Sequence, residues 1–307
     1  MHALFSVFGI ILLGLVLRRL NFVNQSFWDQ AEKTTYFVFF PALLASNLAT
    51  AELSGPSAAS STLGMALAPV LAVLVLSALI LALRPLLRMP GPAFSSVFQG
   101  SVRLNTFIGL AYAEALFGAQ GLALSALVLL PLIPMVNLLC VPVVRYFSEN
   151  GEGPKNNGVG RIALDLLCNP LILGVLAGFL LNLSGLPLPK PLLQFAELLG
   201  RAALPMGLLA VGAGLRKPNL SDQAWPLALS LIFGLLCLPA LCLLFLGLLG
   251  VHGPEGAIAL LFSALPTAPS AYILARQLGG DEKLMAAIIT LGIAAALLTM
   301  PIWLHLV

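Results

Sequence analysis

The chain has 307 residues, of which 60% are hydrophobic and only 9% are charged, and its mean hydropathy is +1.03. Soluble globular domains carry roughly 25% charged residues, so this composition excludes a soluble fold that covers its core with polar surface. The net charge of +3 is too small to indicate a nucleic-acid partner. No polar linker separates two cores, and we therefore expect one all-α integral membrane unit over 1–307.

Apolar segments long enough to cross a bilayer follow one another along the whole chain. A span needs roughly 20 apolar residues to cross a hydrocarbon core of about 30 Å. The first segment has Arg18 and Arg19 after it rather than before it, which is the opposite of a signal peptide, so we count it as a span. The ten expected spans are 3–18, 34–51, 62–83, 93–116, 120–146, 161–182, 192–215, 224–249, 254–275 and 284–306.

The basic residues predict how these spans are oriented. With the N-terminus outside, the connections after spans one, three, five, seven and nine hold twelve of the fifteen lysines and arginines. The opposite side receives only Lys190, and Arg103 and Arg201 fall within spans. Cytoplasmic connections carry such an excess of basic residues. We therefore expect both termini on the non-cytoplasmic side of a cell membrane.

An internal duplication relates the two halves of the chain. Pro41 in the second span and Pro205 in the seventh are 164 residues apart. The same offset pairs Gly14 with Gly178, Asn105 with Pro269, and Thr106 with Ser270. Five spans per half is an odd number, so the halves must insert as inverted repeats. Such repeats are typical of secondary transporters, which hold the substrate near the midplane with discontinuous helices.

The fourth span, 93–116, and the ninth, 254–275, carry polar residues at their centres. In the ninth, Pro266 and Pro269 lack N–H donors, so we expect the helix to open there. Open backbone in a membrane persists only where protein or a water-filled cavity surrounds it. Two broken helices, one from each half, are therefore expected to cross at the centre. Their half-helix N-termini would favour anions.

Single polar residues within the spans suggest a site. An arginine at a span centre costs roughly 2.5–3.5 kcal/mol on insertion, so Arg103 should face a partner or a cavity. It either receives an anionic substrate, or stands in for a cation near the crossing, or caps the carbonyls of a broken helix. Asn137 lies between Pro134 and Pro142 and needs partners, which a cavity beside the crossing would supply.

Two further charged residues have alternative interpretations. Glu197 and Arg201 are four residues apart on one face of the seventh span, which favours a structural ion pair. A role in ion coupling is the alternative, because acids within the membrane are typically functional. The cysteines and histidines have no metal-ligand spacing, so neither a metal site nor a cofactor is expected.

Three stretches of the chain resemble the auxin efflux carrier family, in particular its bacterial members, many of which are labelled malonate or malate transporters. The stretches are Phe98–Leu110, Pro134–Asn137 and Leu265–Arg276, and the resemblance extends over the whole chain. It implies ten spans with broken crossing helices four and nine, in the fold of bile-acid sodium symporters and sodium/proton antiporters. It also implies a location in a bacterial inner membrane.

The family resemblance further implies two domains with different roles and a class of substrate. A scaffold domain would comprise about 1–55 and 161–217, and a transport domain about 60–150 and 222–307. The transport domain would carry small organic anions, auxin-like or mono- and dicarboxylates, by an elevator-type motion. A homodimer through the scaffold domain and coupling to H⁺ or Na⁺ are further expectations. The substrate-site candidates are Arg103, Asn105, Thr106, Asn137, Pro266, Thr267 and Ser270.

Rival functions make different demands on the sequence. An intramembrane enzyme needs a Ser/His pair, paired aspartates or a His-Glu-x-x-His motif, and these are missing from the spans. A sensor would bind its ligand at the same crossing without moving it. A cation/proton antiporter normally has an aspartate near the crossing, where this chain has Arg103. The enzyme is rejected, and the other two remain as alternatives to an anion transporter.

The first prediction concerns topology. Cysteines introduced at Gly153 and Val307 should be labelled from opposite sides of the membrane, because the basic residues put 151–157 in the cytoplasm and the C-terminus outside. A membrane-impermeant thiol reagent applied to oriented vesicles measures this. Labelling of both positions from the same side would contradict the ten-span topology.

Overall fold

The computed structural model describes residues 2–51, 56–148, 169–185, 189–216 and 223–306. Apart from one isolated β-bridge, all regular secondary structure in these ranges is helical, which confirms the all-α prediction. Five of the described helices are long and apolar enough to cross a membrane, namely Ser61–Leu87, Thr106–Tyr146, Lys190–Gly214, Ala224–Leu249 and Glu282–Leu304. Part of the sixth expected span, the predicted loop 151–157 and Val307 lie outside the described residues.

The chain divides into two compact units, each assembled from separate stretches of sequence. The first unit comprises Met1–Ser60, Phe107–Leu130 and Val159–Gly214, and the second comprises Ser61–Thr106, Pro131–Gly158 and Leu215–Val307. The helix α6 (Thr106–Tyr146) contributes to both. It bends at Gly118, whose φ of 57° and ψ of −141° suit a residue without a Cβ. This bend falls between the expected fourth and fifth spans.

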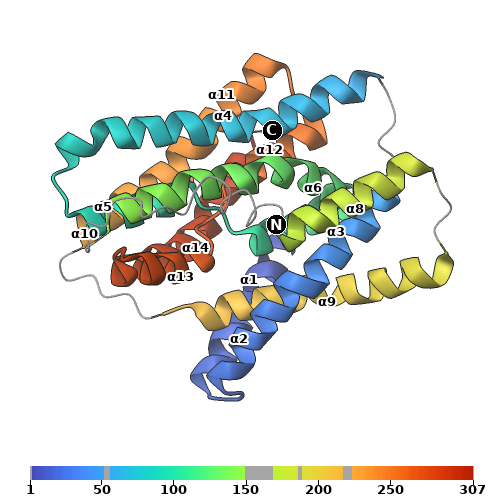
Figure 1. Ribbon diagram of the computed structural model, residues 1–307, viewed down its shortest axis with the longest axis horizontal. Coiled ribbons are helices and arrows are strands. Elements are labelled where there is room, and N and C mark those ends of the chain that lie inside the picture. Colours follow the sequence, from blue (N-terminus) through green and yellow to red (C-terminus); the bar gives the residue numbers. More distant parts are fainter. Residues whose placement is uncertain (1, 52–55, 149–168, 186–188, 217–222, 307) are drawn as a thin grey trace. The chain divides into compact units, whose positions relative to one another are not determined.

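In the first unit, small residues let helix backbones approach closely. Its helices outside α6 are α1 (His2–Arg19), α2 (Gln25–Thr34), α3 (Phe40–Ala49), α8 (Pro170–Ser184) and α9 (Lys190–Gly214), with the π-helical turn η1 (Thr35–Phe39) before α3. α3 packs against α8 and α9, and α1 packs against α9 (Figure 1). A Cβ at Gly174 or Gly178 of α8 would collide with the backbone of Pro41 or Ala45 in α3. Such contacts between small residues are typical of helix pairs in membranes.

The second expected span, 34–51, belongs to a longer helical run that begins at Gln25. The side chain of Asn24 accepts a hydrogen bond from the Phe27 N–H at 2.9 Å and starts the helix there. The residues from Gln25 to Thr34 are mostly polar, so a hydropathy criterion starts this segment later than the helix itself begins. The helix therefore extends before the predicted span, and its apolar part lies where it was expected.

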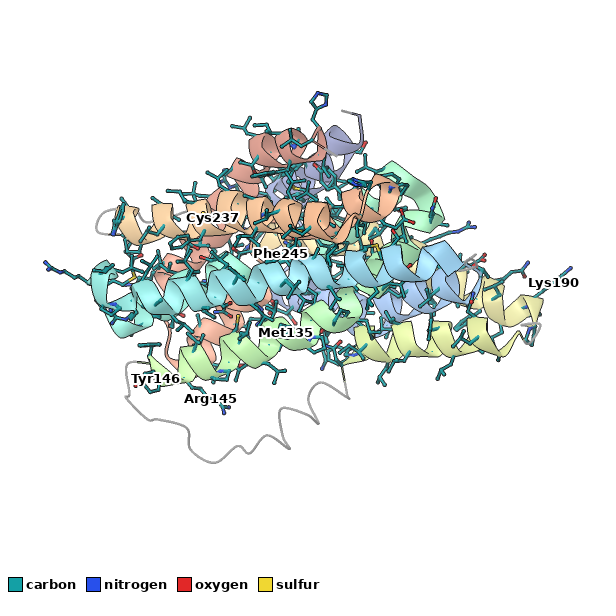
Figure 2. The ribbon with its side chains drawn as sticks, turned by 90° about the horizontal axis from the view of Figure 1, so that it is seen from above. Met135, Arg145, Tyr146, Lys190, Cys237 and Phe245 are labelled. Carbon is teal, nitrogen blue, oxygen red and sulfur yellow. The ribbon has the colours of Figure 1, made fainter. Side chains whose placement is uncertain are left out.

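The second unit holds the remaining helices. They are α4 (Pro56–Leu87), α5 (Gly91–Val102), α10 (Ala224–Ile232), α11 (Leu238–Leu249), α12 (Gly253–Ser263), α13 (Ser270–Leu278) and α14 (Glu282–Leu304), with the π-helical turn η2 (Phe233–Cys237) before α11. α5 packs against α10, α13 and α14, and α14 also packs against α12. In Figure 2, Met135, Arg145 and Tyr146 follow one another toward the C-terminal end of α6, and Cys237 and Phe245 mark η2 and α11.

Both π-helical turns precede a proline. Pro41 follows η1 and Pro239 follows η2, each two residues after the turn ends. A proline has no N–H to donate and clashes with the carbonyl four residues earlier, so the turn before it widens. In the second unit, the Leu235 carbonyl that Pro239 cannot serve accepts a hydrogen bond from Trp303 Nε1 at 2.8 Å. The Trp303 side chain of α14 thus satisfies the carbonyl that the proline leaves without its helical donor.

The second prediction concerns the packing of α1 on α9. A Cβ at Gly212 would overlap the carbonyl oxygen of Ile11, so Gly212→Ala must push the two helices apart. We expect a loss of roughly 1–3 kcal/mol in stability, as for other overpacked contacts. The melting temperature of the detergent-solubilised protein measures it.

Gly9→Ala on α1 is the matched control, because a Cβ there meets nothing within 4 Å. It should cost no stability, since alanine is the better helix former. Equal melting temperatures for Gly212→Ala and Gly9→Ala would contradict the close approach.

Candidate functional site

Two helices of the second unit are interrupted, and the unwound segments pair with each other. α5 ends at Val102 before α6 begins at Thr106, and α12 ends at Ser263 before α13 begins at Ser270. Leu104 and Thr267 form an antiparallel bridge. The Asn105 N–H donates to the Pro266 carbonyl at 2.9 Å, and the Ala268 N–H donates to the Arg103 carbonyl at 3.1 Å. The pairing satisfies backbone groups that an apolar environment could not.

The two interruptions have different local causes. Pro266 and Pro269 break the second of them, as their missing N–H groups predict. The first contains no proline, so it depends on its partner segment. Thr267 Oγ1 donates to the Gly100 carbonyl at 2.6 Å, in the last turn of α5. The open segment of one helix therefore stabilises the end of the other.

Close packing fixes α5 at this point. Every residue from Ala93 to Val102 is buried. A Cβ at Gly100 would lie 2.5 Å from Ser230 Oγ of α10 and 2.8 Å from Ile288 Cγ2 of α14, so only glycine fits between these helices. The paired segments 103–105 and 264–269, which we call the crossing, are therefore positioned by the packing of α5 on α10 and α14 as well as by the bridge.

Arg103 immediately follows α5 and carries the one positive charge of the crossing. Its Nε donates weakly to Ser270 Oγ at 3.4 Å, and its guanidinium also contacts the Cys140 thiol of α6. Its Nη1 is buried without a hydrogen-bond partner in the described part of the chain. The backbone N–H of Arg103 caps the Gln99 carbonyl, but no described bond joins the guanidinium to a helix-end carbonyl. The capping role predicted as one alternative therefore falls to the backbone.

The other predicted site residues lie at or near this crossing. Asn105 is 0% exposed and Thr267 is 4% exposed, both within the paired segments. Thr106 and Ser270 are the first residues of α6 and α13, so each stands at a half-helix N-terminus. Asn137 lies three residues before Cys140 on α6, a spacing that puts two residues on neighbouring positions of one helix face. The arrangement concentrates positive charge and N–H dipoles, which suits an anion.

Gln99 is a residue of the crossing to which the sequence analysis assigned no role. It is 0% exposed, its Nε2 donates to the Ala271 carbonyl at 3.3 Å, and its Oε1 has no partner among the described residues. It precedes Arg103 by four residues, and the Arg103 N–H bonds to its carbonyl at 2.9 Å. That spacing between two polar residues in an apolar span was the available signal.

Comparison with known proteins now assigns the family. Residues 1–304 match the family described as "Membrane transport protein". The chain belongs to this family. It is also 27% identical over 189 residues to a protein of Rhizobium meliloti (strain 1021) named "Putative malonate transporter". That match covers 58% of this chain and 59% of the relative, so it spans less than two thirds of that protein.

The family confirms the resemblance to bacterial auxin efflux carriers. The chain is a multi-pass membrane protein, and its family is one of membrane transport proteins rather than enzymes. The polar groups and the two half-helix N-termini gather where the interrupted segments pair, which makes this region the candidate site.

Glu197 and Arg201 of the transporter do not form the expected ion pair. Both side chains are exposed on α9 in the first unit, and no bond joins them in the described residues. The helical spacing was right, but an exposed pair of this kind is worth only about 0.3–0.5 kcal/mol. This free energy is too small to offset the entropy lost when two long side chains are held in one geometry. The prediction of the ion pair was therefore wrong. A role in ion coupling stays the alternative interpretation of the two residues.

The third prediction tests that role. Because the two side chains are exposed and have no partner among the residues that the structure describes, we expect Glu197→Gln, Arg201→Gln and the double variant to keep normal uptake. Initial rates with and without an imposed pH gradient in proteoliposomes measure this. If Glu197→Gln folds normally but loses pH-driven uptake, Glu197 carries the coupling proton.

Proposed function

We propose that this transporter is a secondary active carrier of small organic anions that binds its substrate at the crossing. The observation that carries the proposal is Arg103 Nη1, a buried donor without a partner in the described residues. A guanidinium nitrogen in that position needs an acceptor, because leaving a charged donor unpaired is costly. A carboxylate is an acceptor-only group that arginine can bind with two parallel bonds.

The surroundings of Arg103 support an anion further. α6 and α13 both begin at the crossing, and each N-terminus offers a partial positive charge. No aspartate or glutamate lies in the segments 99–106 and 264–271. The Rhizobium meliloti relative is named for malonate, a dicarboxylate. Auxin-like acids and mono- or dicarboxylates are therefore the proposed substrate class, with H⁺ or Na⁺ coupling left open.

The proposed mechanism is an elevator-type alternating access built on ten spans in two inverted repeats. The half-helices α6 and α13 begin at Thr106 and Ser270, the pair related by the offset of the sequence repeat. This register supports the duplication. The scaffold domain would comprise about 1–55 and 161–217, and the transport domain about 60–150 and 222–307. Residues 107–130 group with the first unit, so the proposed division and the two compact units differ within α6.

Further features of the proposal concern the cellular setting. The distribution of basic residues favours ten spans with both termini on the non-cytoplasmic side. A bacterial inner membrane and a homodimer through the scaffold domain follow from the family resemblance. Asn105, Thr106, Asn137, Pro266, Thr267 and Ser270 complete the proposed site around Arg103.

The fourth prediction tests the site. Arg103→Ala and Asn105→Ala should each weaken the binding of a carboxylate about ten- to a hundredfold, since charge-assisted hydrogen bonds contribute roughly 1.5–3 kcal/mol. Arg103→Lys should also weaken it, because lysine keeps the charge but loses the planar fork. Calorimetric titration of mono- and dicarboxylates into the purified protein gives the affinities.

Arg19→Ala is the matched control, because Arg19 is exposed near the end of α1 and has no described partner. It should leave affinity unchanged. Unchanged affinity in both Arg103→Ala and Asn105→Ala would put the substrate site elsewhere. Binding without uptake into proteoliposomes would identify a sensor instead of a carrier.

A further inference from the structure

Gln99 presents a hydrogen-bond acceptor that no donor in the described part of the chain uses. Its side chain is completely buried in α5, one turn before the interruption. The amide nitrogen is occupied, because Nε2 donates to the Ala271 carbonyl at 3.3 Å, and this bond fixes which end of the amide carries the oxygen. Oε1 then has no donor among the described residues. A buried amide oxygen is normally satisfied, so its vacancy calls for an explanation.

The unpaired acceptor of Gln99 and the unpaired donor of Arg103 belong to side chains that both contact the first turn of α13. Gln99 Nε2 bonds to Ala271 and Arg103 Nε bonds to Ser270, so both side chains reach adjacent residues in the first turn of α13. Within the described ranges, Oε1 of Gln99 has no donor and Nη1 of Arg103 has no acceptor. One small ligand that carries an acceptor beside a donor would satisfy both. An ionised carboxylate alone would satisfy only Arg103, because it has no hydrogen to donate.

We propose that Gln99 Oε1 accepts a hydrogen bond from the ligand, and that the site therefore selects carboxylates with a hydroxyl group next to the carboxylate. The inference rests on the proposed function, since it assumes that Arg103 binds the carboxylate. Gln99 is then a specificity-determining residue of the same site. Both free atoms are covered by protein in this conformation. A ligand therefore reaches them only after the side chains that cover them move.

Pairs of carboxylates that differ by one hydroxyl group test the inference. Suitable pairs are malonate with hydroxymalonate, succinate with malate, and propionate with lactate, titrated well above the carboxyl pKa values so that no protonated carboxyl can donate. In the unaltered protein, the hydroxylated member of a pair that binds should bind about ten-fold more tightly, the effect of one hydrogen bond. In Gln99→Met, which keeps the length but removes the acceptor, this ratio should fall to about one.

The ratio is measured within each variant, so a general loss of affinity does not disturb it. Ser101→Ala is the matched control, because Ser101 is also buried on α5 but its hydroxyl donates to the Val97 carbonyl at 2.7 Å. It should keep the preference. If Gln99→Met does not fold, Gln99→Asn withdraws the amide by one methylene group and should lower the ratio in the same way.

The outcomes separate this inference from the function on which it rests. Carboxylates that bind without any preference for the hydroxyl group would overturn the role of Gln99 and leave the anion site intact. A preference that survives in Gln99→Met would also overturn it. Failure of every carboxylate to bind the unaltered protein would overturn the proposed function and this inference together.

Discussion

The structure of the second unit depends on one requirement, that backbone freed from a helix inside an apolar protein must find another partner. The segments 103–105 and 264–269 are both open, and each supplies what the other lacks. Asn105 donates to Pro266, Ala268 donates to Arg103, and Thr267 reaches the Gly100 carbonyl. An isolated break would leave these groups unsatisfied at a cost of several kcal/mol each. The two interruptions therefore exist only as a pair.

That mutual dependence explains which parts of the site the sequence could predict. Pro266 and Pro269 act locally, so the opening of the helix around them was visible in the sequence. The opening at 103–105 was suggested only by polar residues and by the repeat, because its cause is a segment more than 160 residues away. The same limit applies to Gln99, whose unpaired oxygen is defined by a contact with Ala271. Non-local pairing leaves no local signature.

The remaining differences between sequence and structure follow from the limits of hydropathy. Apolar runs located the helices well, and α10 to α11 covers the expected 224–249. Hydropathy did not detect the polar start of the helix at Gln25, which a side-chain cap at Asn24 determines. Hydropathy also did not show that Glu197 and Arg201 are exposed. For exposed residues, a helical spacing of four is not sufficient to form an ion pair. Helix caps and side-chain exposure depend on the contacts of single residues, which a hydropathy average over a segment does not contain.

The polar residues of α5 show how the protein separates structural from functional polarity. Ser95 and Ser101 are buried, but each hydroxyl donates to a carbonyl of the chain one turn earlier, and Ser96 donates to the Asp281 carbonyl before α14. These groups are satisfied without any ligand. Gln99 and Arg103 alone on this segment keep unpaired polar atoms in the described structure. The other polar side chains of α5 are satisfied within the described structure, so these two atoms stand out beside the open segment 103–105. An anion that brings its own donor would satisfy both of them.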